Sequence, residues 1–559
     1  MNRRDFLALA SAAPAASQQI GDLLRDAQLT EGARHRSVMG INGVVATADS
    51  HGSLAGIRML MRGGNAVDAI VAAAAALNVA EPYMSGMAGF GGFMLIYMAR
   101  ERRVFALDMM GTSPAAAAIG KFTEKDCDEG YLAPIVPGAL KGWAAALGRF
   151  GTLSLGDVFE PAIELAERGL AVTHYDALAF QATAAKLAKF PSTARVLLPG
   201  GKPPRAGQIL KQPDLARTFR LVALEGAETM YQGRLGEEIV RFLRANGGLL
   251  TIDDFRKFEV RWREPIQTTF QKHRLYGMPP GSCGITMFQI LNIMDGFDLK
   301  GMPPNRVEFA HRWLEAAKLA FLDDDRHNTG KDVDIPVARL ISADYAASQR
   351  ARIDAKRSAA FPGRPLETFG TTSLAAADRW GNLVAFTQSL VSGFGSGVIA
   401  GNTGLLLNNG HRYGFVLDPR HVNSLVPGQR AKGVMSPTLV FRGEQPLMAV
   451  GAAGGYTIPQ TVGQVINRVV THGMDIQQAI AAPRILINRG GGQVPVGGEA
   501  QCYIEPELDG SLKTGLESLG HRLTGPGNAG GVQGVTIDPE SGVFSGGSDP
   551  RRDGHAVAW

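Results

Sequence analysis

The sequence predicts an α+β protein in which groups of helices pack on antiparallel sheets. Short apolar runs come in pairs joined by polar turns, while long Ala- and Leu-rich segments form separate groups. Strands joined in pairs by short turns are antiparallel neighbours, and grouped helices cover the faces of such sheets. With 559 residues, 45% of them hydrophobic, the chain has ample apolar material for a large core.

The first folded segment is predicted to hold a strand, a buried helix and a second strand. Residues 44–48 (VVATA) are β-branched and apolar, which favours a strand. Residues 65–79 are Ala-rich without Gly or Pro, which indicates a buried helix that ends at Pro82. A glycine-dense turn at 85–92 then leads into a buried strand at 93–97.

The middle of the chain is predicted to be mainly helical. Leu, Ala and Phe recur at helical spacing across residues 140–330, as in the segments 140–150, 155–168 and 307–321. Residues 330–370 are polar and contain Pro362, Gly363, Pro365 and Gly370. We expect them to form an exposed, mobile segment that tolerates cutting.

After Gly370 the pattern changes to short strands and shorter helices. The first pair of strands is joined by the polar turn 378–382 (DRWGN). The predicted strands are 373–377, 383–390, 438–441, 448–450, 532–538 and 543–545, and the predicted helices are 462–471 and 476–482.

Composition excludes several classes of function. The net charge of +5 is too small to indicate a nucleic-acid partner, and the longest apolar runs are too short to span a membrane. The three cysteines, Cys127, Cys283 and Cys502, lie far apart and show no CxxC spacing. No HExxH motif is present, so we expect neither a metal nor another cofactor.

The N-terminus carries a candidate export signal. Arg3-Arg4-Asp5-Phe6-Leu7 precedes an apolar run of small residues, which resembles a twin-arginine signal. We therefore expect residues 1–30 to lie outside the fold and the mature protein to be periplasmic or secreted. The alternative is a disordered arm on a cytoplasmic protein.

Gly370-Thr371-Thr372-Ser373 opens the first hairpin of the second half. A threonine hydroxyl becomes a nucleophile only when a base takes its proton. The α-amine of an N-terminal threonine is such a base, since its pKa of about 7.7–8.0 leaves part of it neutral near pH 7. An internal Thr371 has no free amine, so cleavage after Gly370 must come first. By itself this pattern is more typical of an ordinary strand start.

Many further blocks appear in an order that resembles the γ-glutamyltranspeptidase family, from about residue 44 to the C-terminus. These blocks are residues 63–69 (GGNAVDA), the turn 85–92, 246–251 (NGGLLT), 278–284 (MPPGSCG), 315–318 (EAAK), 371–372 (TT), 394–397 (FGSG), 404–409 (GLLLNN), 435–438 (MSPT), 451–455 (GAAGG) and 548–551 (SDPR).

The resemblance implies an N-terminal nucleophile hydrolase with a four-layer αββα sandwich. The precursor would cut itself into a large chain, 31–370, and a small chain, 371–559, which stay associated. Thr371 would be the nucleophile, and Ser389 matches the family's second hydroxyl residue. Gly454 and Gly455 match the glycines whose backbone N–H groups form the oxyanion hole, where glycine permits close approach to the substrate.

The positions that hold a glutamyl group in this family are replaced here. Met110 stands where an arginine binds the α-carboxylate, Tyr413 falls near the acidic residue that pairs with the α-amine, and Val391 replaces an asparagine. Gly433 and Val434 replace a serine pair. We expect these residues, together with Gly410, to line a rebuilt substrate site, because a pocket does not bury ligand charges unpaired.

The sequence thus predicts a self-processing amidohydrolase or acyltransferase of the divergent, acylase-like branch of the family, acting on a small-molecule amide. Water and an amine remain open as acceptors of the acyl group. One alternative is a true γ-glutamyl transpeptidase that cleaves glutathione. A second is a non-catalytic binding protein on the same fold.

Overall fold

A computed structural model describes residues 36–363, 370–489, 500–508, 510–524 and 529–559. The candidate signal at residues 1–30 and the six residues before Gly370 lie outside these ranges. Within them, no helix combines the length and the apolar character that crossing a membrane requires.

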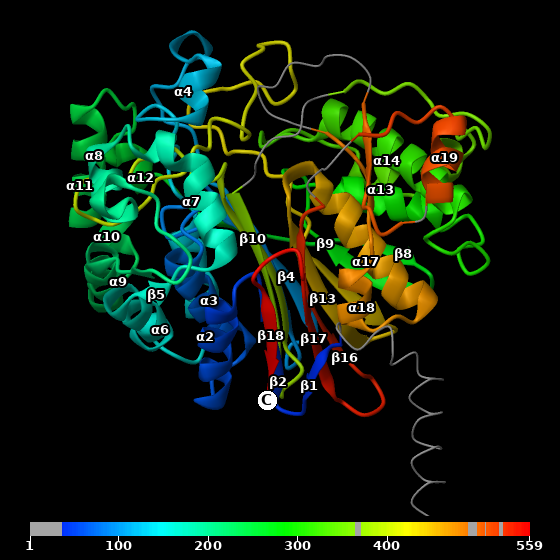
Figure 1. Ribbon diagram of the computed structural model, residues 1–559, viewed down its shortest axis with the longest axis horizontal. Coiled ribbons are helices and arrows are strands. Elements are labelled where there is room, and N and C mark those ends of the chain that lie inside the picture. The colour runs from blue at the N-terminus through cyan, green and yellow to red at the C-terminus, as the bar shows by residue number, and fades with distance from the viewer. Residues whose placement is uncertain (1–35, 364–369, 490–499, 509, 525–528) are drawn as a thin grey trace, which may run out of the picture.

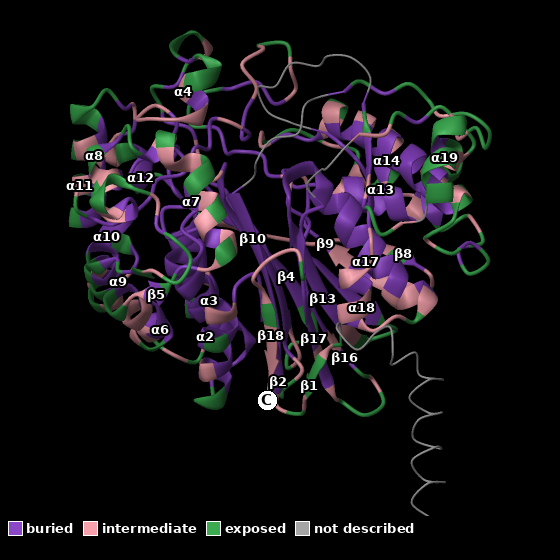
Figure 2. Ribbon diagram, viewed as in Figure 1, coloured by how far each residue is buried: buried purple, intermediate pink, exposed green. Residues whose placement is uncertain are grey.

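The described chain forms four layers, helices–sheet–sheet–helices, as the sequence predicts (Figure 1). Two seven-stranded sheets face each other in the middle, and every strand pair in them is antiparallel. The purple colouring of Figure 2 shows that the central strands of the sheets and the inner faces of both helical layers are buried.

The two sheets have these strand orders. One is β1 (Val38–Gly40), β17 (Phe544–Ser548), β16 (Gly531–Ile537), β13 (Gln445–Ala453), β12 (Thr438–Arg442), β9 (His273–Gly277) and β8 (Ile266–Phe270). The other is β18 (His555–Ala558), β2 (Gly43–Thr47), β10 (Gly370–Asp378), β11 (Leu383–Val391), β3 (Gly91–Met98), β4 (Arg103–Asp108) and β7 (Arg261–Arg263). Two short pairs, β5 (Leu170–Ala171) with β6 (Ile209–Leu210) and β14 (Ile485–Ile487) with β15 (Cys502–Ile504), lie outside them.

The helical layers lie on opposite outer faces of the sandwich (Figure 1). The layer beside β10 and β3 comprises α2 (Ser50–Met61), α3 (Ala66–Ala80), α5 (Ala139–Phe150), α6 (Leu155–Arg168), α7 (His174–Leu187), α8 (Pro191–Leu197), α9 (Pro213–Glu225), α10 (Glu228–Tyr231), α11 (Arg234–Ala245) and α12 (Ile252–Arg256), with α4 (Glu124–Asp128) above it. The other layer comprises α13 (Gly284–Met294), α14 (Val307–His327), α15 (Val337–Leu340), α16 (Ala343–Arg350), α17 (Ile458–His472), α18 (Ile476–Ala481) and α19 (Gly510–Ser518).

Helix α3 is buried along its whole length and anchors the central hairpin. Asn65 and Asp68 form a capping box at its start, which satisfies backbone N–H groups that a helix leaves unpaired. The Ala66 N–H donates to Asp378 Oδ2 at 2.8 Å, and Asp378 is the last residue of β10, where the turn to β11 begins. The small side chains of α3 allow close packing against the sheet that carries Thr371.

Most predicted elements are confirmed, including the hairpin β10–β11, helix α3 and the buried strand β3. The segment 330–370, expected to be exposed and mobile, contains two helices that the sequence did not predict, α15 and α16. Leu340 and Ala346 bury their side chains in the helical layer of α13. Strands β8 and β9, in the stretch predicted as mainly helical, were also missed.

Candidate active site

The hairpin β10–β11 brings Thr371 and Ser389 face to face. The two residues are paired across the strands, and Thr371 Oγ1 lies 2.9 Å from Ser389 Oγ. Ser389 Oγ also donates to the Gly370 carbonyl at 2.5 Å and accepts the Val391 N–H at 2.8 Å. Because a hydroxyl has a single proton to donate, the proton between the two hydroxyls belongs to Thr371. Ser389 therefore contacts both the attacking hydroxyl and the carbonyl of the Gly370–Thr371 peptide.

Only glycine fits at position 370. A Cβ placed there would lie 2.2 Å from the Ser392 carbonyl oxygen and 2.7 Å from that of Tyr83. Both oxygens belong to backbone, which does not move aside easily. This close approach lets β10 bulge at Gly370–Thr371 and presents the peptide to Ser389.

Val391, which pairs with Gly370, has a left-handed backbone with φ of 95°. A β-branched residue rarely adopts this conformation, and such strain costs about 1–3 kcal/mol. The conformation points the Val391 N–H at Ser389 Oγ. Val391, predicted as a substrate-site residue, thus also supports the Ser389 hydroxyl.

On the other side of the strand, a buried carboxyl contacts Thr372. Thr372 Oγ1 donates to Glu81 Oε2 at 2.8 Å, and Arg552 Nη1 approaches the Thr371 carbonyl oxygen at 3.4 Å. Burial raises the pKa of Glu81 to about 8, while Arg552 opposes this rise and Asp49 adds to it. Sequence reasoning missed both Glu81 and Arg552. The available signal was an acid inside the apolar run 79–82 (VAEP).

The raised pKa of Glu81 predicts a specific pH dependence of stability. Between its ordinary value of 4.5 and about 8, Glu81 keeps its proton only in the folded state, so stability falls as pH rises through this window. We expect the melting temperature of Glu81→Gln to fall less between pH 5 and pH 8 than that of the wild type. Scanning calorimetry at the two pH values measures this, and equal slopes would contradict it.

Gly454 and Gly455 follow the strand that faces β10. Both have positive φ, 132° and 63°, which favours glycine, and they precede the N-terminus of α17. A Cβ at Gly451 of β13 would lie 2.5 Å from Ser373 Oγ, which places β13 directly opposite β10. Ala453 pairs with Gly531, whose own Cβ would lie 2.6 Å from Arg552 Nε. Because Arg552 reaches the Thr371 carbonyl, β13 ends at the level of Thr371.

Two of the predicted substrate-site residues, Met110 and Gly433, lie in contact range of each other. A Cβ at Gly433 would lie 2.7 Å from a ring carbon of Phe93 and 3.2 Å from Met110 Cε. A Cβ at Gly91, which pairs with Ser389, would lie 2.7 Å from Met110 Cα. Met110 therefore lies next to the strand that pairs with Ser389, and its side chain and the Phe93 ring bring apolar atoms to Gly433.

The structure places the remaining predicted residues as follows. Gly410 follows Asn409, whose N–H donates to the Leu390 carbonyl at 3.1 Å, next to Ser389. Tyr413 is buried, with the Arg412 guanidinium 6.0 Å from its ring centre, and Val434 packs half-buried on the core. We name Met110, Phe93, Gly433 and Val434 the apolar wall.

Three cationic side chains near these loops form ion pairs or hydrogen bonds within the protein. Lys432 Nζ lies 3.0 Å from Asp324 Oδ2 in the interior, and Arg420 pairs with Asp418 at the surface. Arg430 donates to the Met110 carbonyl and lies 3.9 Å from Asp108. Burial is the largest influence and opposes the charge of Lys432, but Asp324, Tyr456 and Cys283 together outweigh it and raise the lysine pKa. These charges stabilise the loops behind the apolar wall.

One cluster of metal-ligand type, His311, Glu315 and His521, occurs among the described residues. His311 Nε2 lies 2.7 Å from the Asp354 carbonyl and therefore carries a proton, so His311 Nδ1 accepts from His521 Nε2 at 2.8 Å. Glu315 accepts from Lys318 Nζ at 2.6 Å. Burial lowers the pKa of His521 to about 3, and Lys318 adds to this. The hydrogen bonds of the three side chains are therefore made within the protein, and the nearby Lys318 ammonium disfavours the binding of a metal cation.

Comparisons with known proteins agree with this fold and hairpin. The γ-glutamyltranspeptidase family model matches residues 52–559. The acylase ACY 1 proenzyme of Pseudomonas sp. (strain V22) is 36% identical over 93% of this chain and 94% of its own. The glutathione hydrolase-like YwrD proenzyme of Bacillus subtilis (strain 168) is 34% identical over 94% of this chain and 99% of its own.

Solved structures show the same architecture. The cephalosporin acylase from Bacillus halodurans superposes with a TM-score of 0.85 at 32% identity, covering 94% of this chain and 97% of that one. The γ-glutamyltranspeptidase of Helicobacter pylori gives a TM-score of 0.53 at 31% identity, covering 55% of this chain and 90% of that one.

The fold is thus that of the N-terminal nucleophile hydrolases, the class to which these structures belong. Within that class, the chain belongs to the γ-glutamyltranspeptidase family. It is an amidohydrolase of this family, and relatives named acylase and glutathione hydrolase-like agree with the prediction of an enzyme not specialised for glutathione.

Proposed function

We propose that the chain cuts itself between Gly370 and Thr371 and then hydrolyses amides with Thr371 as its N-terminal nucleophile. The observation that carries this proposal is the contact of Ser389 Oγ with both Thr371 Oγ1, at 2.9 Å, and the Gly370 carbonyl oxygen, at 2.5 Å. The products would be a large chain that ends at Gly370 and a small chain, 371–559, held together by the shared sheet and core. The name "proenzyme" given to the relatives supports such processing.

The self-cleavage would run as an acyl shift from nitrogen to oxygen. Thr371 Oγ1 attacks the Gly370 carbonyl carbon and passes its proton towards Ser389, whose own hydroxyl polarises the carbonyl oxygen. The C–N bond breaks, the Thr371 nitrogen takes up a proton, and an ester joins Gly370 to Thr371. Water then hydrolyses the ester, which releases the Gly370 carboxylate and frees both the hydroxyl and the α-amine of Thr371.

In turnover, the freed α-amine of Thr371 would act as the base. The Thr371 oxygen attacks the substrate carbonyl, its proton passes through the amine to the leaving nitrogen, and an acyl-enzyme forms. The backbone N–H groups of Gly454 and Gly455 would stabilise the developing oxyanion. Water, or an amine that enters the site, then takes the acyl group. In the uncut chain Thr371 is 4% exposed, so cleavage would also open the site.

The apolar wall predicts which acyl groups the enzyme prefers. A γ-glutamyl group brings two charges, and Met110 and Gly433 offer neither charge nor hydrogen bond to them. We expect kcat/KM for uncharged acyl p-nitroanilides, such as hexanoyl, to exceed that for γ-glutamyl-p-nitroanilide by at least about tenfold, a difference of about 1.4 kcal/mol in transition-state binding. Release of p-nitroaniline by the matured protein measures both.

The same assay separates the alternatives. Efficient γ-glutamyl turnover would overturn the preference and favour a true transpeptidase. Complete self-cleavage without turnover of any amide in a broad panel would favour a binding protein on this fold. The Thr371→Ala protein sets the background rate in each case.

We also propose export through the twin-arginine motif at Arg3-Arg4. Fractionation of cells that produce the wild type or Arg3→Lys/Arg4→Lys tests this. An unchanged distribution would contradict it.

A further inference from the structure

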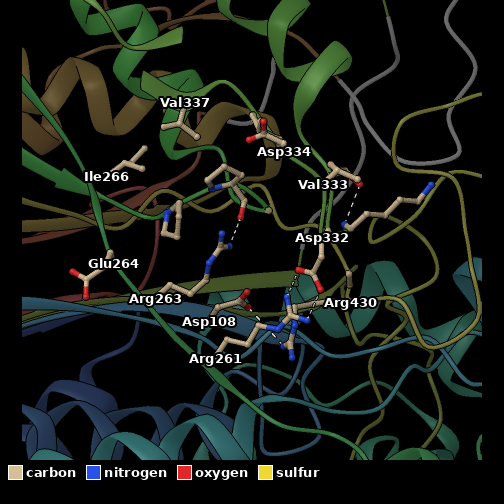
Figure 3. Close-up of a pocket in the computed structure, with 18 of the residues that line it drawn as sticks. Asp108, Arg261, Arg263, Glu264, Ile266, Asp332, Val333, Asp334, Val337 and Arg430 are labelled. Atoms are coloured by element: carbon tan, nitrogen blue, oxygen red, sulfur yellow. Dashed lines mark hydrogen bonds and ion pairs between the residues drawn. The ribbon is translucent and has the colours of Figure 1, made fainter. Parts of the chain in front are cut away.

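A cavity lies at the edge of the two sheets, where β7 and β8 meet the loop after α14 and the segment that carries Arg430 and Ala431. It has a volume of about 420 Å³. Figure 3 shows Arg263 extending into it from β7, with Asp334 and Val337 on the opposite side and Arg261, Asp108, Asp332 and Arg430 grouped at one end. None of the proposed catalytic residues lines it.

Two cations that line this cavity have no carboxylate partner among the described residues. The half-buried Arg263 guanidinium donates from Nη1 to the Pro280 carbonyl at 2.6 Å. Lys331 Nζ donates to Ser424 Oγ at 2.8 Å. Burial lowers the pKa of Arg263, with Asp108 opposing, which marks a charge that the protein compensates only in part.

Most of the acidic side chains that line the cavity already pair with an arginine of the protein. Arg261 binds Asp332 through two hydrogen bonds, of 2.6 and 2.9 Å, and Arg430 lies 3.9 Å from the buried Asp108. Glu264 pairs with Arg103. The last lining acid, Asp334, is exposed to solvent. Arg263 is therefore a half-buried arginine that lines the cavity without an ion pair to any described carboxylate.

The lining of the cavity is mixed, and part of it is apolar. Ile266 of β8 and Val337 of α15 lie on different sides of it in Figure 3, and Pro279 and Ile335 also line it. A guanidinium presents a planar fork of N–H donors that matches a carboxylate, and apolar walls favour a ligand with a hydrocarbon body.

We propose that this cavity is a second binding site, which takes a small organic carboxylate with an apolar body. The carboxylate binds the Arg263 guanidinium, and the hydrocarbon part packs between the Ile266 and Val337 sides. Binding of the carboxylate in this cavity affects the proposed substrate site at Thr371 through the segment 430–433. Arg430 and Ala431 line the cavity, Arg430 also donates to the Met110 carbonyl, and Gly433 N–H donates to the Gly281 carbonyl at 2.7 Å.

Calorimetric titration of the uncut Thr371→Ala protein with sodium hexanoate tests the site without any need for turnover. We expect hexanoate to bind. Acetate lacks the hydrocarbon body and hexanamide lacks the charged carboxylate, so each should bind at least about tenfold more weakly. Arg263→Gln should weaken hexanoate binding at least about tenfold, since a hydrogen bond to a charged group is worth about 1.5–3 kcal/mol. Arg263→Lys keeps the charge and should recover part of the affinity.

Arg274→Gln is the matched control, because it removes an arginine charge from β9 outside the cavity and should leave the affinity unchanged. Absence of hexanoate binding, or binding that survives Arg263→Gln, would overturn the site. In the matured wild type, hexanoate should change KM for the anilide substrate, and Arg263→Gln should abolish the change. Binding without any change in KM would overturn the coupling.

Discussion

Thr371→Ala is expected to remain a single chain and to lose amide turnover by at least about 10⁴-fold, as other enzymes do when their nucleophile is removed. The substitution deletes the oxygen that lies 2.9 Å from Ser389 Oγ and leaves the Gly370–Thr371 peptide without an attacking group. Denaturing electrophoresis shows the cleavage, and p-nitroaniline release shows the turnover.

The control for this experiment is Thr371→Ser, which keeps the hydroxyl and, once cut, the α-amine. We expect it to cleave and to turn over substrate at reduced rates, since it lacks the methyl group that fixes the threonine rotamer. Cleavage of Thr371→Ala at the wild-type rate would mean that another group cuts the chain.

Ser389→Ala is expected to slow self-cleavage by about 10²–10³-fold, the usual effect of removing one oxyanion donor. The Ser389 hydroxyl is donor to the Gly370 carbonyl at 2.5 Å and acceptor for Thr371 Oγ1. Its loss leaves the carbonyl unpolarised and the Thr371 proton without an acceptor. Densitometry of the uncut band over time measures the rate.

Thr387→Ala is the matched control for Ser389→Ala. Thr387 lies two residues earlier on β11 and is equally buried, but its hydroxyl contacts Ser373 at 3.2 Å and not the scissile peptide. We expect cleavage within about threefold of the wild type, because a buried hydroxyl of this kind contributes mainly to stability. Equal slowing of both variants would attribute the effect of Ser389 to folding.

The central hairpin could be predicted because its signals are local. Two largely apolar runs flank the turn 378–382, and Asp378 accepts from the Trp380 and Asn382 N–H groups inside that turn. Strands β8 and β9 were missed because they are short and half-exposed, and they become strands through the pairing of β9 with β12, more than 150 residues later. Helices α15 and α16 were missed because Leu340 and Ala346 become buried only against α13.

For the site, resemblance supplied Thr371, Ser389 and the glycine pair, and the hairpin register brings the first two together. The replaced positions Met110 and Gly433 meet across the fold, which spacing alone does not show. Glu81 and Arg552 lie at opposite ends of the sequence. Their approach to β10 follows from α3 and from the C-terminal strands, so only the structure reveals it.

The most direct test of the account is the intact mass of the purified protein together with N-terminal sequencing of its fragments. The account predicts two chains, one that ends at Gly370 and one that begins Thr371-Thr372-Ser373, and an uncut chain for Thr371→Ala. A wild-type protein that stays in one piece, or one cut at another bond, would contradict it.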